Sequence, residues 1–345
     1  MNGVSNVTFQ NSNIGPCAGR GIYINGGGSN NIFDSYIHVE DLASRCCDTH
    51  DGIFVNNSNS NTLQGNVVAY GETNIQMFNS LSSIVRGNFL LNPQGPFPRG
   101  EQIQNGSGSN NAFITNNLLV STPDATLGPA IGTSNSAPIL YGQNNSGSRP
   151  SDNLSIYVST YADVENNYIT GGLDATTPGS GGAQDSAGCG LIQDGSGDHG
   201  TFKNNVLVNT GECGIGIAIG TNMTVIGNKT ISLNPNTGGN TADYIWKQGT
   251  SCGPVVLNGN ISTLIRAGGY ASGYWDGGGC APVTCDGTNT NVNSCNTFDS
   301  GSGRTAYNAL IADPAVTKPP PIPPQPKNCV VNSPYSTQTS LPPCN

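Results

Sequence analysis

The sequence predicts an all-β protein built as a solenoid, in which short coils of chain stack into a rod. Three observations lead to this fold class. First, Gly contributes 48 of 345 residues and Pro another 22, while only 10% are charged, so residues that favour helices are sparse and residues that favour turns are common. Second, a short phrase recurs about every 22 residues. Third, Cys residues recur at the same place in that phrase.

The same composition excludes several classes of protein. No apolar run approaches the roughly 20 residues that a transmembrane helix needs, so we expect no membrane span. With 12 Lys+Arg against 21 Asp+Glu, the net charge is -9, and the chain lacks the basic stripe that nucleic-acid binding requires. The 11 Cys with no C-x-x-C pair favour disulfides over zinc, and therefore a secreted or extracytoplasmic protein. No signal peptide is visible, so we expect that an N-terminal region was removed.

The repeated phrase consists of apolar–polar–apolar residues, a polar spacer, and then Gly or Asn followed by Asn and an apolar residue. Degenerate copies come first, at 7–9 and 31–33. The closest copies are 88 − 66 = 22 and 228 − 205 = 23 residues apart, and wider gaps contain the predicted loops 122–150, 172–187 and 232–241. The copies end at Asn66, Asn88, Asn117, Asn167, Asn205, Asn228 and Asn260.

Each copy alternates with period two, which is typical of strands and turns. One copy cannot bury its apolar face alone, but stacked copies form a continuous core. Ten or eleven coils at a spacing of about 4.8 Å make a rod on the order of 50 Å long. We expect the recurrent Asn to bond the equivalent Asn of the next coil while its backbone adopts a turn conformation. These Asn residues are therefore structural.

The Cys spacing supports the stacking, because Cys at one register in neighbouring coils lie close enough to bridge. The spacing predicts two bridges between coils and two that close local loops. Cys17 is expected to pair with Cys46 or Cys47, which leaves one thiol over. The predicted bridges are Cys189–Cys213, Cys252–Cys280, Cys285–Cys295 and Cys329–Cys344.

The repeat stops near residue 300, which divides the chain into a solenoid domain at 1–300 and a C-terminal tail at 301–345. Residues 304–312 predict a short helix, and the Pro-rich run at 319–324 predicts an extended polyproline segment. We expect this tail to pack on the rod and cover its last open coil.

Residues 5–300 resemble the right-handed parallel β-helix proteins of the pectate-lyase-like superfamily, through the Asn ladder, the coil length and the loop insertions. The likeness is nearest to bacterial secreted β-helix repeat proteins without an established activity. The resemblance implies a single-stranded right-handed parallel β-helix and an extracellular polysaccharide as ligand. The chain departs from the superfamily's enzymes, since only 48–51 and 197–200 partly echo polygalacturonase motifs. The first 202 residues contain no Lys, so no Lys-plus-Arg pair of the chondroitinase/alginate-lyase type can be placed.

One group of charged residues precedes the strands of coils three to five, at nearly the same register. Stacking would bring them to one flank of the rod, beside the Pro-rich loop 92–100. Paired carboxylates can hydrolyse a glycosidic bond, whereas a lyase needs a base and a group that neutralises a uronate. A carboxylate ladder could also hold Ca²⁺; alternatively, these polar residues are only solvated. The group comprises Asp48, His50, Asp51, Glu72, Arg99 and Glu101, with Gln76 and Gln104 at matching outward positions.

A second candidate is Trp246 with Trp275, which are 29 residues apart at positions that match in the repeat. If Ile245 and Tyr274 point inward, both indoles point outward and can stack on a sugar face; the alternative is that they pack under the tail. We therefore expect a secreted, monomeric, carbohydrate-active β-helix that binds and cleaves a polysaccharide by lyase or hydrolase chemistry. The alternative is a non-catalytic surface or matrix protein.

Overall fold

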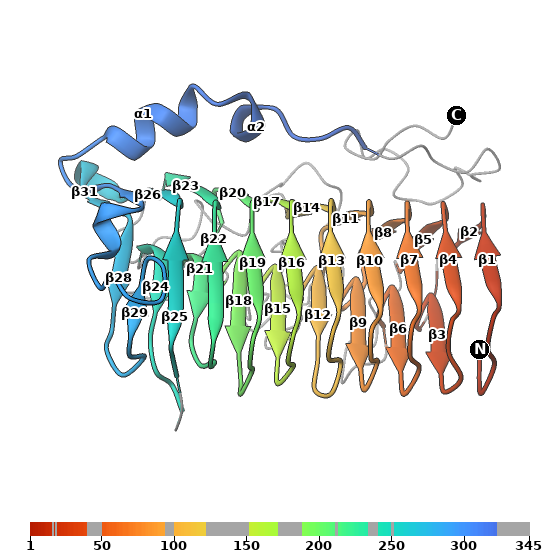
Figure 1. Cartoon of the computed structure of the whole chain (residues 1–345). Coiled ribbons are helices and arrows are strands. Elements are labelled where there is room, and N and C mark those ends of the chain that lie inside the picture. Colours follow the sequence, from red (N-terminus) through yellow and green to blue (C-terminus); the bar gives the residue numbers. More distant parts are fainter. Residues whose placement is uncertain are drawn as a thin grey trace, which may run out of the picture.

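The computed structural model is a parallel β-helix of ten coils (Figure 1). It describes residues 1–322 except 16, 18, 40–49, 94–99, 122–151, 172–187, 211–212, 234–240 and 250–251. Within these residues the strands form three sheets of nine, ten and twelve strands, one on each side of the rod. Nearly every pair is parallel; the exceptions are β26–β27 and β27–β31. The predicted fold class is confirmed.

The sheets run the length of the rod, and each of the first nine coils contributes a strand to each of the three sheets in turn. The nine-stranded sheet contains β3 (Ile22–Asn25), β6 (Ile53–Asn56), β9 (Ile75–Phe78), β12 (Ile103–Asn105), β15 (Leu154–Tyr157), β18 (Leu191–Asp194), β21 (Cys213–Ile217), β24 (Thr241–Ile245) and β28 (Tyr274–Asp276). The ten-stranded sheet contains β1 (Thr8–Gln10), β4 (Asn31–Phe33), β7 (Thr62–Gln64), β10 (Ile84–Arg86), β13 (Phe113–Thr115), β16 (Asp163–Glu165), β19 (Thr201–Lys203), β22 (Met223–Ile226), β25 (Val255–Asn258) and β29 (Val283–Thr284).

The twelve-stranded sheet carries the C-terminal elements. It contains β2 (Asn13–Ile14), β5 (Tyr36–His38), β8 (Val67–Ala69), β11 (Phe89–Leu91), β14 (Leu118–Ser121), β17 (Tyr168–Gly171), β20 (Val206–Val208), β23 (Lys229–Leu233), β26 (Ile261–Ile265), β27 (Ala271–Ser272), β30 (Thr297–Phe298) and β31 (Ser300–Gly301). Two 3₁₀ turns, η1 (Ala267–Gly269) and η2 (Val292–Ser294), and two helices, α1 (Thr305–Ile311) and α2 (Pro314–Thr317), complete the described chain.

Inward side chains of all three sheets form one continuous core along the rod axis. On the nine-stranded sheet, Ile24, Val55 and Met77 occupy successive steps of one inward column and are fully buried. Stacked identical positions let Val, Ile and Leu pack in register, which is why each copy of the repeat alternates apolar and polar residues.

The predicted Asn ladder is confirmed along one corner of the rod. Asn117 illustrates one step: its amide nitrogen donates to Asn167 Oδ1 (2.9 Å) and to the Val85 carbonyl (2.9 Å), and its Oδ1 accepts from Asn88 Nδ2 (2.9 Å). The residue with positive φ is the one before the ladder Asn, such as Gly87 (62°) or Asn116 (56°). The Gly/Asn-Asn phrase therefore combines a left-handed turn residue with a ladder residue, whereas we expected one Asn to do both. The ladder runs through Asn66, Asn88, Asn117, Asn167, Asn205, Asn228, Asn260 and Asn296.

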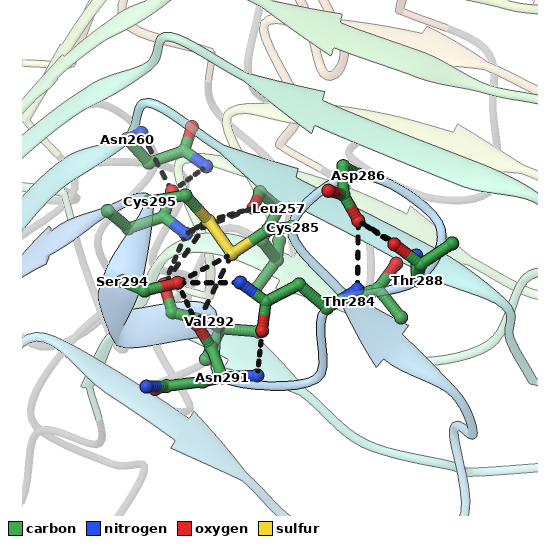
Figure 2. Close-up of a disulfide and its surroundings, with 12 residues drawn as sticks. Leu257, Asn260, Thr284, Cys285, Asp286, Thr288, Asn291, Val292, Ser294 and Cys295 are labelled. Atoms are coloured by element: carbon green, nitrogen blue, oxygen red, sulfur yellow. Dashed lines mark hydrogen bonds between the residues drawn. A yellow bond between two sulfur atoms is a disulfide. The ribbon is translucent and has the colours of Figure 1, made fainter.

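Three of the predicted disulfides are present: Cys189–Cys213, Cys252–Cys280 and Cys285–Cys295. The first two join neighbouring coils, and the third closes a loop in the last coil, close to Asn260 of the Asn ladder (Figure 2). Cys329 with Cys344, and Cys46 or Cys47 as partner of Cys17, lie outside the described residues.

The predicted helix at 304–312 is present as α1. It packs with α2 against β20, β23 and β26, on the side of the rod (Figure 1). The Tyr168 hydroxyl donates to the Val316 carbonyl (2.7 Å), and Lys229 Nζ lies 2.6 Å from Asp313 Oδ2. The tail therefore packs on the rod as expected: its described helices lie along a lateral sheet, and α1 also contacts β30 of the last coil. The domain boundary at residue 300 stays a prediction. None of the helices in the described part of the chain is long and apolar enough to cross a bilayer.

Candidate functional site

Four of the six charged residues predicted to form a site are described, and they lie at the corner where each coil passes from the twelve-stranded to the nine-stranded sheet. In the sequence, most of the undescribed residues come between a strand of the twelve-stranded sheet and the next strand of the nine-stranded sheet, including those between β5 and β6, β11 and β12, and β14 and β15. Asp48 and Arg99 belong to these segments and so lie outside the described residues. The other four predicted charged residues are described, and all four are buried.

Backbone hydrogen bonds define the register at this corner. The Gly52 N–H donates to the Thr73 carbonyl (3.0 Å), and the Asn74 N–H donates to the Glu101 carbonyl (3.1 Å). Asp51, Thr73 and Glu101 therefore occupy one column, as predicted for the two acids. Glu72 comes one residue before Thr73 in the chain, and its N–H donates to the His50 carbonyl (2.8 Å).

A hydrogen-bonded network joins Glu101 to the two predicted Gln residues. Glu101 accepts from Thr73 Oγ1 at Oε2 (3.0 Å) and from Gln104 Nε2 at Oε1 (3.3 Å). Gln104 Oε1 in turn accepts from Gln76 Nε2 (2.8 Å). Gln76 and Gln104 are paired across β9 and β12 at the same outward position, as predicted. These contacts hold one carboxylate in a fixed, water-poor position, which is what a general acid or base requires.

Asp51 has a different environment from Glu101. Its Oδ2 lies 2.9 Å from Arg20 Nε, and the Arg20 guanidinium also lies over the Phe54 ring at 4.3 Å and the Tyr23 ring at 4.9 Å. Arg20 was not predicted as part of the site. It places a positive charge beside Asp51, on the same flank of the rod as Glu101, although Arg20 itself lies three coils from Glu101.

The two Trp residues lie at the other end of the nine-stranded sheet, and both are exposed: Trp246 by 37% and Trp275 by 44%. Trp275 stacks on Tyr244 with ring centroids 5.2 Å apart, and Trp246 meets Tyr244 edge-on at 6.0 Å. A Cβ at Gly277 would lie 2.5 Å from Trp275 and 2.7 Å from Trp246. Only a Gly fits between the indoles without displacing them.

The predicted match between Trp246 and Trp275 is wrong by two residues. Trp275 pairs with Tyr244, and Ile245 pairs with Asp276. Tyr274 is nevertheless inward and Trp275 outward, as expected, because Tyr274 pairs with the buried Asp243. The sequence reasoning missed Tyr244, whose position two residues before Trp246 on one strand was the available signal.

These rings line a pocket of about 240 Å³, which we call the aromatic pocket. Its remaining lining comes from a guanidinium and two hydroxyl-bearing side chains. The volume lies just below the usual range for sites that enclose drug-sized ligands, so it suits one small ring. The aromatic pocket is lined by Thr241, Tyr244, Trp246, Arg266, Ser272 and Trp275.

A buried carboxyl lies behind the aromatic pocket, inside the rod. Asp243 is fully buried, and its Oδ2 accepts from Ser262 Oγ (2.8 Å). Its Oδ1 is buried without a hydrogen bond from the described residues. Burial raises the pKa of Asp243 to about 7, although the hydrogen bond from Ser262 opposes the shift. Burial and then the charges of Asp276 and Asp243 also raise the pKa of Tyr274.

No group of three His, Cys, Asp or Glu side chains lies close enough to hold a metal ion within the described ranges. In the predicted Ca²⁺ ladder, Asp51 pairs with Arg20 and Glu101 accepts a hydrogen bond from Thr73, and Ca²⁺ at this corner stays a prediction.

No protein family and no curated protein matches this sequence. Solved structures do match. DFA-IIIase from Arthrobacter chlorophenolicus in complex with GF2 is 12% identical with a TM-score of 0.40, over 82% of this chain and 54% of that one. The Dettilon tailspike protein is 13% identical with a TM-score of 0.43, over 72% and 49%. A double mutant of the tailspike protein of E. coli bacteriophage HK620 in complex with pentasaccharide is 13% identical with a TM-score of 0.39, over 76% and 43%. The chain thus spans about half the length of these proteins.

Proposed function

We propose that this protein is a secreted, carbohydrate-active β-helix that binds a polysaccharide on the outer face of its nine-stranded sheet. The observation that carries the proposal is the aromatic pocket, in which three rings, a guanidinium and two hydroxyl groups line one small open space. Sugar rings present C–H groups on their faces and hydroxyl groups on their edges. Aromatic faces and polar hydrogen-bonding groups placed side by side complement both.

Burial and charge favour this site for the first contact with a glycan. Trp246 and Trp275 are exposed, whereas Gln76, Gln104 and Glu101 are buried. Three disulfides in the described chain fit an oxidising, extracellular setting, where such a ligand would be met. The net charge of -9 argues against nucleic acid as the ligand. We propose that the protein acts as a monomer.

Replacing Trp275 with Ala is expected to weaken glycan binding about 30-fold, or ~2 kcal/mol, because it removes one of two stacked rings that carry the contact. Isothermal titration calorimetry against a panel of plant and bacterial polysaccharide fragments measures the affinity. Phe113→Ala is the matched control: Phe113 is 37% exposed, on the ten-stranded sheet, and its loss should leave affinity unchanged. The proposal is wrong if the wild-type protein binds no glycan of the panel, or if both variants bind as tightly as wild type.

A second proposal is that the corner of coils three to five cleaves the bound polysaccharide. It is supported by three buried acids and a His on consecutive coils, at the corner where the chain carries its long insertions. Glu101 is the candidate acid or base, Asp51 and Glu72 are candidate partners, and His50 is a further candidate base. Asp48 and Arg99 remain candidates from the sequence alone. The alternative is a non-catalytic matrix or adhesive protein, in which this network only stabilises the corner.

Glu101→Gln is expected to lower any cleavage rate by at least about a hundredfold, since it removes the proton-transferring group and keeps an acceptor for Thr73. The assay follows unsaturated ends by absorbance and new reducing ends chemically, with and without Ca²⁺, so that lyase and hydrolase chemistry are separated. Glu165→Gln serves as control, because Glu165 lies on the ten-stranded sheet beside Lys203. If the wild-type protein produces neither unsaturated ends nor new reducing ends, the non-catalytic alternative is favoured.

A further inference from the structure

The strands that carry the stacked rings of the aromatic pocket also carry a buried acid, Asp243, and a partly buried phenol, Tyr274. Asp243 pairs with Tyr274 and Tyr244 pairs with Trp275, across β24 and β28. Because side chains alternate along a strand, the first pair faces the interior and the second pair faces the pocket. We call Asp243 and Tyr274 the inner pair and Tyr244 and Trp275 the outer pair. A change in the spacing of β24 and β28 that gives water access to the inner pair must also change the distance between the two rings of the outer pair.

Among the described residues, the strands next to Asp243 and Tyr274 direct no positive charge at Asp243. β28 contributes the Tyr274 hydroxyl and, two residues on, the exposed Asp276 carboxylate, neither of which is positively charged. β26 and β23 contribute only the hydroxyl groups of Ser262 and Thr230. The cations nearest along these two strands are directed elsewhere: Lys229 pairs with Asp313, and Arg266 lines the aromatic pocket.

Ionisation of Asp243 is therefore costly unless the strands move. A neutral carboxyl can donate a proton as well as accept one, which suits an oxygen that lacks a partner among the described residues. A carboxylate in the same place would be desolvated and only partly hydrogen-bonded. Water can reach it if β28, the last strand of the nine-stranded sheet, separates from β24. That movement separates Trp275 from Tyr244 as well.

We propose that Asp243 is a pH-dependent switch for the aromatic pocket, which binds its sugar when Asp243 is neutral and loses affinity when Asp243 ionises. This inference rests on the proposed sugar-binding function and adds its regulation. The pocket is closed in the acidic state, with the Tyr244 and Trp275 rings 5.2 Å apart, and loosened in the alkaline state. Burial places the midpoint of the change near pH 7.

The test measures sugar affinity from pH 5.5 to 8.5 in wild type, Asp243→Asn and Asp276→Asn. Wild type is expected to weaken about tenfold across this range, within the usual size of a coupling between two sites. Asp243→Asn should change less than about twofold, because its amide does not ionise. Asp276→Asn keeps the buried acid and should retain the wild-type pH profile. A flat wild-type profile, or an equal loss of affinity in Asp243→Asn, overturns the switch.

A ligand-free measurement separates failure of the switch from failure of the proposed function. The chain contains 2 Trp, so the two indole N–H signals of ¹⁵N-Trp-labelled protein report directly on the pocket. The Trp275 signal is expected to move with a midpoint near pH 7 in wild type without any sugar. If this movement occurs but no glycan binds at any pH, the sugar-binding proposal fails, whereas the coupling between ionisation of Asp243 and the environment of Trp275 is retained. If the signals do not move, the switch fails whether or not sugar binds.

Discussion

Replacing Asp243 with Asn is expected to change stability in a pH-dependent way. The free energy of unfolding of the variant minus that of wild type should be larger at pH 8 than at pH 4, by on the order of 4 kcal/mol. Burial raises the pKa of Asp243 to about 7, against 3.8 for an exposed Asp. The folded protein therefore keeps a proton that the unfolded chain releases between these two values. The stabilising effect of the neutral carboxyl is complete below about pH 4 and is lost as the pH rises through about 7. Asn does not ionise, so the variant does not lose stability over this pH range for this reason.

The difference between variant and wild type is the quantity to measure, because other titrating groups are common to both. Urea unfolding at pH 4, 6 and 8 gives the free energy of unfolding of each protein. Asp276→Asn is a suitable control, since Asp276 lies on the same strand as Tyr274 but is exposed. A constant difference across pH for Asp243→Asn would show that the buried carboxyl is ionised throughout, contrary to its packing.

Replacing Asn117 with Ala is expected to destabilise the fold by about 4 kcal/mol. The substitution removes the acceptor for the Asn88 backbone and amide, and it removes the donor to the Val85 carbonyl. All three groups lie in the interior of the rod, where an unpaired donor or acceptor costs about 1–3 kcal/mol. The loss should also weaken the stacking of the two neighbouring coils, because each coil contacts only its neighbours.

Asn116→Gly provides the control for the ladder. Asn116 is exposed and has a φ of 56°, so a Gly adopts its conformation without strain. We expect a change of less than about 1 kcal/mol in urea unfolding at that position. If Asn117→Ala and Asn116→Gly both lower the free energy of unfolding by the same small amount, the hydrogen bonds of the Asn ladder contribute little to stability.

The rod could be predicted from the sequence because its determinants repeat. The Asn ladder at Asn66 and Asn88, and the bridge between Cys189 and Cys213, follow from positions that recur in neighbouring coils. The Asn ladder shows the limit of this reasoning: the sequence does not show that Gly87 or Asn116 takes the left-handed turn while the following Asn forms the ladder.

The sites were less predictable because coil lengths vary. Trp246 and Trp275 are 29 residues apart, but the true partners Tyr244 and Trp275 are 275 − 244 = 31 apart. Periodicity alone cannot assign residues to columns to within one residue when each turn can differ in length.

Asp243 was missed for a related reason. A charged residue in an apolar column is visible in the sequence only when the register is known, and β24 follows one of the long insertions. Pairing with Ile215 of β21 places it inward.

The most direct test of the central claim is to titrate ¹⁵N-Trp-labelled protein at pH 6 with the polysaccharide fragment that it binds, and to follow its two indole signals. The account predicts that both the Trp246 and the Trp275 signals shift and saturate together, because both indoles line the aromatic pocket. Binding of the fragment while both indole signals stay unmoved would contradict it.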